Sequence, residues 1–192
     1  MPTRFTRYLS CEMPLRVFTV LALIAAACAR APGTPEVRYE PTPMDVAQAM
    51  LELAEVGARD LVADLGCGDG RIVIEAARRY GARGLCVDLD PRRIAEARRN
   101  AAAAGVAERI TFLNQDLFAT ELRGVTVVML FLSPGFNLKL RPKLARELAP
   151  GARVVSHWHP MGDWPPSRTL RIRSDGRERP VYLWVHCADG CR

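Results

Sequence analysis

The chain has 192 residues, of which 49% are hydrophobic and 25% are charged. This length and composition are typical of one globular domain with a full hydrophobic core, and they exclude a largely disordered chain and a small disulfide-rich scaffold. The formal net charge is +6, but the basic residues are nearly all arginine and are distributed along the whole chain. The charge therefore does not indicate a nucleic-acid partner, and we expect none.

The N-terminal segment has the features of a targeting leader. Three arginines within the first 16 residues precede the apolar run 17–27, which is too short to cross a bilayer but is typical of the core of a signal peptide. The small residues around Cys28 fit either lipoprotein-type cleavage or an ordinary signal peptide. We expect residues 1–29 to be a leader that exports the protein or anchors it to a membrane; the alternative is an uncleaved hydrophobic arm.

A proline-rich segment follows the leader and predicts the domain boundary. Residues 30–42 are typical of a linker that leads into a docking segment. The remaining chain, residues 43–192, is expected to form the single domain.

Strand and helix periods alternate through that domain. Strands are predicted at 60–65, 84–89, 109–114, 125–132 and 152–157. Helices are predicted at 43–56, 71–80, 90–105, where Asp90 is the expected N-cap, and from near Arg141 to Leu148. Residues 168–173 and 181–187 flank a turn at 174–180 and predict a hairpin. The pattern indicates an α/β fold: a doubly wound, mainly parallel, Rossmann-like sheet with a C-terminal antiparallel hairpin.

The six cysteines do not form a recognisable framework. Cys67 and Cys86 lie in glycine-rich and apolar surroundings, so we predict that both are small packing residues. Cys187 and Cys191 could form a disulfide if the protein is exported. The three histidines match no familiar ligand spacing, and no metal site is predicted.

The segment 61–72, LVADLGCGDGRI, places a cluster of glycines directly after a predicted strand. Ordered glycine is entropically costly, so the cluster indicates a backbone that comes very close to a ligand, at the carboxyl end of a strand where such sheets bind ligands. A dinucleotide site would have the pattern G-x-G-x-x-G, and its third glycine would fall at Arg71. The pattern here is D-x-G-x-G-x-G, formed by Asp64, Gly66, Gly68 and Gly70.

This pattern resembles motif I of the class I, seven-strand S-adenosylmethionine-dependent methyltransferases. The resemblance implies that S-adenosyl-L-methionine is the cofactor, with the glycine N–H groups meeting its carboxylate and an acidic residue suiting its positive charge. It also implies that Asp88, which ends the next strand, binds both ribose hydroxyls, because a carboxylate can accept two hydrogen bonds at once. Asp116, after the third strand, would receive the adenine amino group.

Segments 39–43, 131–157 and 161–164 resemble a narrower group, the archaeal and mitochondrial protein-lysine methyltransferases and their bacterial relatives. The resemblance implies that Tyr39 and Thr42 belong to a segment that closes over the cofactor. It also implies a methyl acceptor site, for which the candidate catalytic residues are Phe131, Asn137 and His157, with Pro134 and Trp164 helping to shape a channel. The sequence departs from the group at Phe131, where tyrosine is common, and at Trp158, where an acidic residue usually follows the histidine.

The resemblance implies an enzyme that methylates an amine, a lysine side chain, of a protein substrate. Separately, we expect the protein to be a monomer. The alternative is a protein of the same fold that binds the cofactor or anchors in the envelope without transferring a methyl group. An NAD-dependent enzyme is disfavoured by Arg71. The leader indicates the cell envelope, whereas a cofactor made in the cytosol indicates the cytoplasm, so both locations stay open.

Overall fold

The computed structural model of the chain describes residues 39–187. The predicted leader, most of the predicted linker and Cys191 lie outside these residues. Seven strands of the described part form one mixed sheet in the order β3-β2-β1-β4-β5-β7-β6. Their bounds are β1 (Leu61–Leu65), β2 (Arg83–Asp88), β3 (Ile110–Asn114), β4 (Val127–Leu130), β5 (Arg153–His157), β6 (Arg168–Ser174) and β7 (Arg177–Val185).

The sheet is parallel from β3 to β5, and β7 and β6 extend it as an antiparallel hairpin. The strand order reverses between β1 and β4, which lie side by side at the centre. In such sheets a ligand binds beside this reversal, outside the carboxyl ends of the strands. The predicted doubly wound sheet with a C-terminal hairpin is confirmed.

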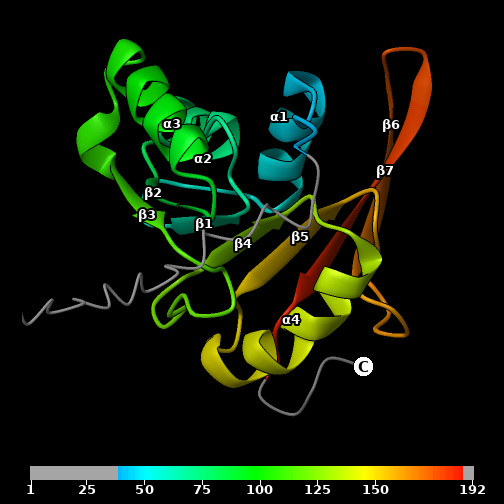
Figure 1. The fold of residues 1–192 in the computed structure, drawn as a ribbon. Helices are drawn as coiled ribbons and strands as arrows, with labels where there is room; N and C mark the ends of the chain where they lie inside the picture. Colours follow the sequence, from blue (N-terminus) through cyan, green and yellow to red (C-terminus); the bar gives the residue numbers. More distant parts are fainter. Residues whose placement is uncertain (1–38, 188–192) are drawn as a thin grey trace, which may run out of the picture. The chain divides into compact units, whose positions relative to one another are not determined.

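The four α-helices of the described part cover the two faces of the sheet (Figure 1). They are α1 (Met44–Leu53), α2 (Arg71–Tyr80), α3 (Pro91–Ala103) and α4 (Pro134–Glu147), with a short 3-10 turn η1 at Ala107–Arg109. Helices α1, α2 and α3 pack on one face and α4 packs on the other (Figure 1). The central strands are therefore buried on both sides, and this explains why their sequences are continuous apolar runs.

Strand β4 packs against helices on both faces of the sheet. Val127 and Met129 pack into the cluster that includes α1 and α2, whereas Val128 and Leu130 pack into the cluster beneath α4, because successive side chains point to opposite faces. All four side chains are fully buried. This double burial holds the carboxyl end of β4 rigidly beside that of β1.

Two predicted boundaries are wrong. Helix α4 begins at Pro134 and not near Arg141, because Pro134 suits the first helical position and Pro142 is tolerated inside the helix on an exposed face. The predicted turn 174–180 is only the pair Asp175 and Gly176, which both have positive φ, as a tight hairpin turn requires. The predicted N-cap of α3 is confirmed, since the Asp90 side chain accepts a hydrogen bond from the Arg92 N–H.

The prediction that Cys67 and Cys86 only fill space is also wrong, because their sulfurs form a disulfide. The N–H groups of Gly66 and Cys67 both donate to the Val87 carbonyl, which folds the glycine loop back over β2. This brings the two cysteine Cα atoms to 5.3 Å, within the usual range for a disulfide. Spacing in the sequence does not reveal such a pairing, since it depends on the path of the loop.

Candidate active site

Three predicted aspartates lie at the carboxyl ends of neighbouring strands. Asp64 is in β1, Asp88 ends β2 and Asp116 follows β3. The Gly68 N–H donates to Asp88 Oδ2 at 2.9 Å, and the Gln115 N–H donates to the Asp88 carbonyl at 3.2 Å. The three strand ends therefore meet at one edge of the sheet, and Asp88 lies between the glycine loop and the segment that carries Asp116.

The glycine loop has a backbone that other residues rarely adopt. Gly68 has φ of +55°, and a Cβ atom there would come within 2.3 Å of the Tyr39 ring. Gly70 has φ of +79°, and a Cβ atom there would come within 2.9 Å of Ala97 on α3. Gly68 thus allows Tyr39 to lie on the loop, while Gly70 allows α2 and α3 to pack closely.

Asp64 is buried, with 4% of its surface exposed. No side chain or backbone N–H of residues 39–187 donates a hydrogen bond to its carboxylate. Burial, followed by the charges of Asp88 and Asp69, raises the pKa of Asp64 to about 8. A buried carboxyl group of this kind ionises readily only when a positive charge binds beside it.

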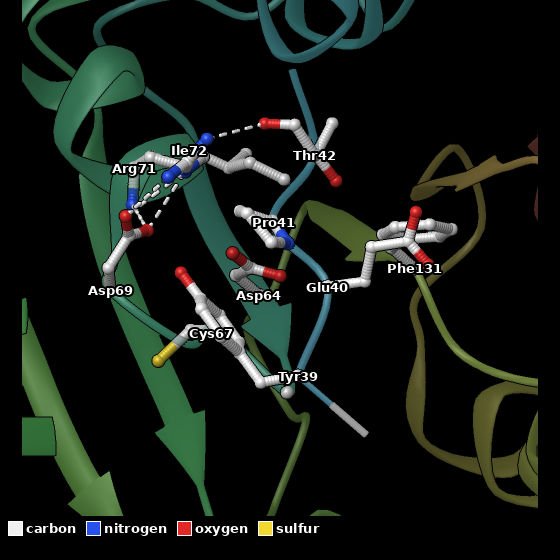
Figure 2. Close-up of a pocket in the computed structure, with 11 residues that line it drawn as sticks. Tyr39, Glu40, Pro41, Thr42, Asp64, Cys67, Asp69, Arg71, Ile72 and Phe131 are labelled. Atoms are coloured by element: carbon white, nitrogen blue, oxygen red, sulfur yellow. Dashed lines mark hydrogen bonds and ion pairs between the residues drawn. The ribbon is translucent and has the colours of Figure 1, made fainter. Parts of the chain in front are cut away.

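A cavity of about 30 Å³ lies between the glycine loop, the end of β4 and the segment ahead of α1 (Figure 2). We call residues 39–43 the strap. Five predicted site residues line the cavity: Tyr39, Thr42, Asp64, Gly66 and Phe131. Six further lining residues were not predicted as site residues: Glu40, Pro41, Cys67, Asp69, Arg71 and Ile72. Four of them lie within the glycine-rich segment 61–72, so their position in that segment could have indicated them.

The remaining predicted residues do not line this cavity. Asp88 and Gly68 lie next to it through their mutual hydrogen bond and the contact of Gly68 with Tyr39. Asp116 accepts a hydrogen bond from the Phe118 N–H and so stabilises its own turn. Trp164 is partly buried and packs against Trp184 at the border of the core beneath α4, and it does not line this cavity.

Phe131 connects the cavity to His157. The two rings lie 4.2 Å apart between centroids, and His157 is fully buried at the end of β5. Burial, followed by the charges of Arg179 and His159, lowers the pKa of His157 to about 4. The imidazole is therefore neutral at physiological pH. Within residues 39–187, neither of its ring nitrogens has a hydrogen-bond partner.

Asn137 lies in the first turn of α4 and is also fully buried. Its Nδ2 donates to Ser156 Oγ at 3.2 Å and to the His159 carbonyl at 3.0 Å. Its Oδ1 has no partner among the described residues. Buried polar atoms are nearly always satisfied in folded proteins, so Asn137 and His157 are suited to bind a polar group of a ligand.

The backbone beside His157 is strained at Trp158. This residue has φ of +69°, which is uncommon for a bulky side chain, and the His159 N–H donates to the His157 carbonyl across a tight turn. The half-exposed indole lies edge-on to His157 with 6.1 Å between ring centroids. Backbone strain of this kind clusters at functional sites, and no pattern in the sequence indicated it.

Within residues 39–187, no group of three or more histidine, cysteine or acidic side chains is placed to hold a metal ion. In the same part of the chain, no helix has both the length and the apolar character needed to span a membrane.

Comparison with known proteins places this site among methyltransferases. Residues 64–168 match the family model described as ANTKMT methyltransferase domain. The chain is 40% identical over 152 residues to a protein-lysine N-methyltransferase of Saccharolobus islandicus (strain REY15A), which covers 79% of this chain and 94% of that protein. It is 33% identical over 174 residues to the adenine nucleotide translocase lysine N-methyltransferase of Mus musculus, covering 90% and 74% of the two chains.

A solved structure from Salinibacter ruber is 47% identical, with a TM-score of 0.74, and covers 77% of this chain and 94% of that one. It is described as an RNA methyltransferase in complex with S-adenosyl-L-homocysteine. The names of these similar proteins agree on methyl transfer and differ on the acceptor, which is a lysine in two of them and RNA in the third.

Proposed function

The chain belongs to the ANTKMT methyltransferase family and is an S-adenosylmethionine-dependent methyltransferase, and we propose that it methylates a lysine side chain of a protein. The names of the two sequence relatives support this acceptor. The main structural support is the contact of Phe131, which lines the cavity, with the buried, neutral His157 behind it. An apolar ring next to an uncharged imidazole favours a neutral amine over a charged ammonium.

The residues present fit the cofactor. When bound, S-adenosylmethionine supplies a methyl group on a positively charged sulfur. The carboxylate of Asp64, buried and without a donor in the described chain, would meet the positive charge at the cofactor's amino end. Asp88 accepts one backbone N–H on each oxygen, and because each oxygen has a second lone pair it could also accept the ribose hydroxyls. Asp116 would lie toward the adenine.

The protein's main task in this reaction is to orient the acceptor and exclude water. Methyl transfer is an in-line displacement, and correct orientation in a shielded site can contribute about 7 to 11 kcal/mol. A lysine ammonium must first lose a proton, and an apolar surface promotes this because it lowers the pKa of the amine. Phe131 would supply that surface, while a nitrogen of His157 or Oδ1 of Asn137 would hold the amine.

A methyl-transfer assay tests the proposal. Full-length protein and S-adenosylmethionine carrying a radiolabelled methyl group are incubated with a cell lysate, and parallel samples are treated with nuclease or protease. We expect the label in protein, resistant to nuclease and recovered as methyllysine after acid hydrolysis, and we expect the Asp64→Asn variant to transfer none. Label that is lost on nuclease treatment would instead identify RNA as the acceptor. Binding of S-adenosylhomocysteine without any transfer would identify a binding protein.

We further propose that residues 1–29 are an export or anchoring leader, followed by a linker up to residue 42. The disulfide between Cys67 and Cys86 supports this, because disulfides persist in oxidising compartments. Mass spectrometry of the mature N-terminus tests it. A first residue at Cys28 with an added lipid would identify a lipoprotein, and an intact Met1 in the purified protein would contradict cleavage.

A further inference from the structure

Arg71 connects the glycine loop to the strap through a single guanidinium group. Its Nε and Nη2 donate to the two carboxylate oxygens of Asp69 at 3.0 and 2.6 Å. Its Nη1 donates to the Thr42 carbonyl at 2.9 Å, and all three residues line the cavity (Figure 2). The two-pronged contact fixes the plane of the guanidinium, so an Nη1 N–H is aimed at the strap.

The pair of Arg71 and Asp69 is partly shielded from water, with 27% and 15% of the two side chains exposed. Burial raises the pKa of Asp69, but the hydrogen bonds and charge of Arg71 outweigh burial and hold that pKa below its ordinary value. The carboxylate is therefore ionised at physiological pH. It orients Arg71 without needing a ligand.

Backbone hydrogen bonds give the strap little attachment of its own. Residues 39–43 belong to no helix or strand, and Pro41 and Pro43 have no N–H group to donate. Pro43 provides no side-chain cap for α1. The bond from Arg71 to the Thr42 carbonyl therefore fixes the strap at the point where it enters the helix.

A second arginine holds the other end of the strap. The Tyr39 ring lies on Gly68, and the guanidinium of Arg93 from α3 lies 4.3 Å from the centroid of that ring. Tyr39 is nevertheless 40% exposed. The aromatic end of the strap is thus held by contacts of the Tyr39 ring and by a hydrogen bond between Tyr39 and Asp69, whereas its Thr42 end has a charged hydrogen bond to Arg71.

We propose that Arg71 and Asp69 are positioning residues that fasten the strap over the cofactor cavity. The inference rests on the cofactor site described above and is independent of the methyl acceptor. Ligand pockets usually enclose about 300 Å³ or more, whereas this cavity measures about 30 Å³. The exposed Tyr39 end of the strap is the part that would move to admit a cofactor. Arg71 holds the Thr42 end in place and returns the strap to a position over the bound cofactor.

The chain contains a matched control for this test. Arg92 donates to Asp90 through Nε and Nη2 in the same aspartate-x-arginine spacing, but it is exposed and makes no contact with the strap. We compare Arg71→Ala and Arg71→Lys with Arg92→Ala in the full-length protein. Lysine retains the charge of arginine but lacks its planar group, so it cannot grip Asp69 and reach Thr42 together.

The first measurement is the Kd for S-adenosylhomocysteine by calorimetry, and the second is hydrogen exchange of a peptide that spans residues 39–50. We expect both Arg71 variants to weaken binding about tenfold or more, as loss of a charged hydrogen bond does, and to speed exchange in the peptide. Arg92→Ala should change neither. If Arg71→Ala unfolds, Arg71→Lys provides the same comparison.

The two measurements distinguish a fastening role of Arg71 from a direct contact with the cofactor and from a nonspecific effect of losing an arginine. Weaker binding without faster exchange would mean that Arg71 contacts the cofactor directly, and would overturn the fastening role. Equal effects of the Arg71 and Arg92 variants would also overturn it. If the unaltered protein fails to bind S-adenosylhomocysteine, the proposed function fails, while the exchange comparison still tests whether Arg71 fastens the strap.

Discussion

The disulfide between Cys67 and Cys86 ties the glycine loop to β2 two residues before Asp88. It therefore fixes two parts of the proposed cofactor site relative to one another: the loop that contacts Tyr39 and the strand end that carries the predicted ribose ligand. Hydrogen bonds from Gly66 and Cys67 to Val87 support the same arrangement. The disulfide and these hydrogen bonds all hold residues 66–67 of the glycine loop against residues 86–87 of β2.

Loss of this disulfide is expected to destabilise the domain. The bridge closes a loop with a sequence separation of 19 residues, for which a stabilisation of about 3 kcal/mol is typical. We expect Cys67→Ala/Cys86→Ala to lower the free energy of unfolding in urea by about that amount. A reductant should destabilise the natural protein and leave the double variant unchanged. Equal sensitivity of both proteins to the reductant would show that the effect arises elsewhere.

Asp64 should make the stability of the free protein fall as pH rises. Its folded pKa of about 8 lies above the ordinary value of 3.8, so the folded state holds a proton that the unfolded state has lost between these pH values. Unfolding measured from pH 5 to pH 8 should show this decline, and Asp64→Asn should reduce it. An unchanged pH dependence in the variant would contradict the assignment of a proton to Asp64.

The same group should make cofactor binding depend on pH in the opposite direction. A positive charge beside Asp64 favours the ionised carboxylate, so binding below pH 8 must release a proton. We expect the affinity for S-adenosylhomocysteine to rise from pH 6 to pH 8. Calorimetry in buffers of different ionisation enthalpy measures the released proton directly. Asp64→Asn should bind more weakly and release none.

His157 is expected to matter for the acceptor and for acid stability. Its pKa of about 4 lies below the ordinary value of 6.5, so stability is retained above pH 6.5 and is lost as pH falls toward 4, where only the unfolded chain takes up a proton readily. His157→Phe should flatten this loss and lower kcat/KM about tenfold through one missing hydrogen bond. The Kd for S-adenosylhomocysteine should stay the same, and His157→Gln should restore part of the activity. A large change in that Kd would place His157 in the cofactor site instead.

Gly68→Ala should weaken cofactor binding beyond the cost of backbone strain. The new Cβ atom would displace the Tyr39 ring, which lies 2.3 Å from that position. Gly81→Ala is the control, because Gly81 also has positive φ, of +68°, but a Cβ atom there would meet Ala58 only at 3.6 Å. Both variants should lose about 1 to 2 kcal/mol of stability. Only Gly68→Ala should raise the Kd for S-adenosylhomocysteine.

Local patterns in the sequence predicted most of the fold. Helix α2 has the predicted bounds, and Asp90 is the N-cap of α3, because periodic apolar residues and capping side chains act over a few residues. The start of α4 was misplaced because Pro142 is usually a helix breaker, although an exposed helix face tolerates it here.

The part of the candidate site formed by sequence motifs at the strand ends was predictable. Asp64, Asp88 and Asp116 follow successive strands, so parallel pairing alone brings their strand ends to one edge. The disulfide and the bond from Arg71 to Thr42 were not predictable, because each depends on how a loop crosses its neighbours. The positive φ of Trp158 was not predictable either, since the residue lies where its N–H donates to the carbonyl of Pro180 in β7.

The buried carboxyl group of Asp64 would also affect the lifetime of the protein in a cell. Its ionisation costs stability in the free domain, whereas a positively charged ligand beside it would favour the ionised form and make the loaded domain unfold less often. Proteases act mainly on opened chains, so molecules that hold the methyl donor would be degraded more slowly than empty ones. The abundance of this enzyme would then follow the supply of its donor.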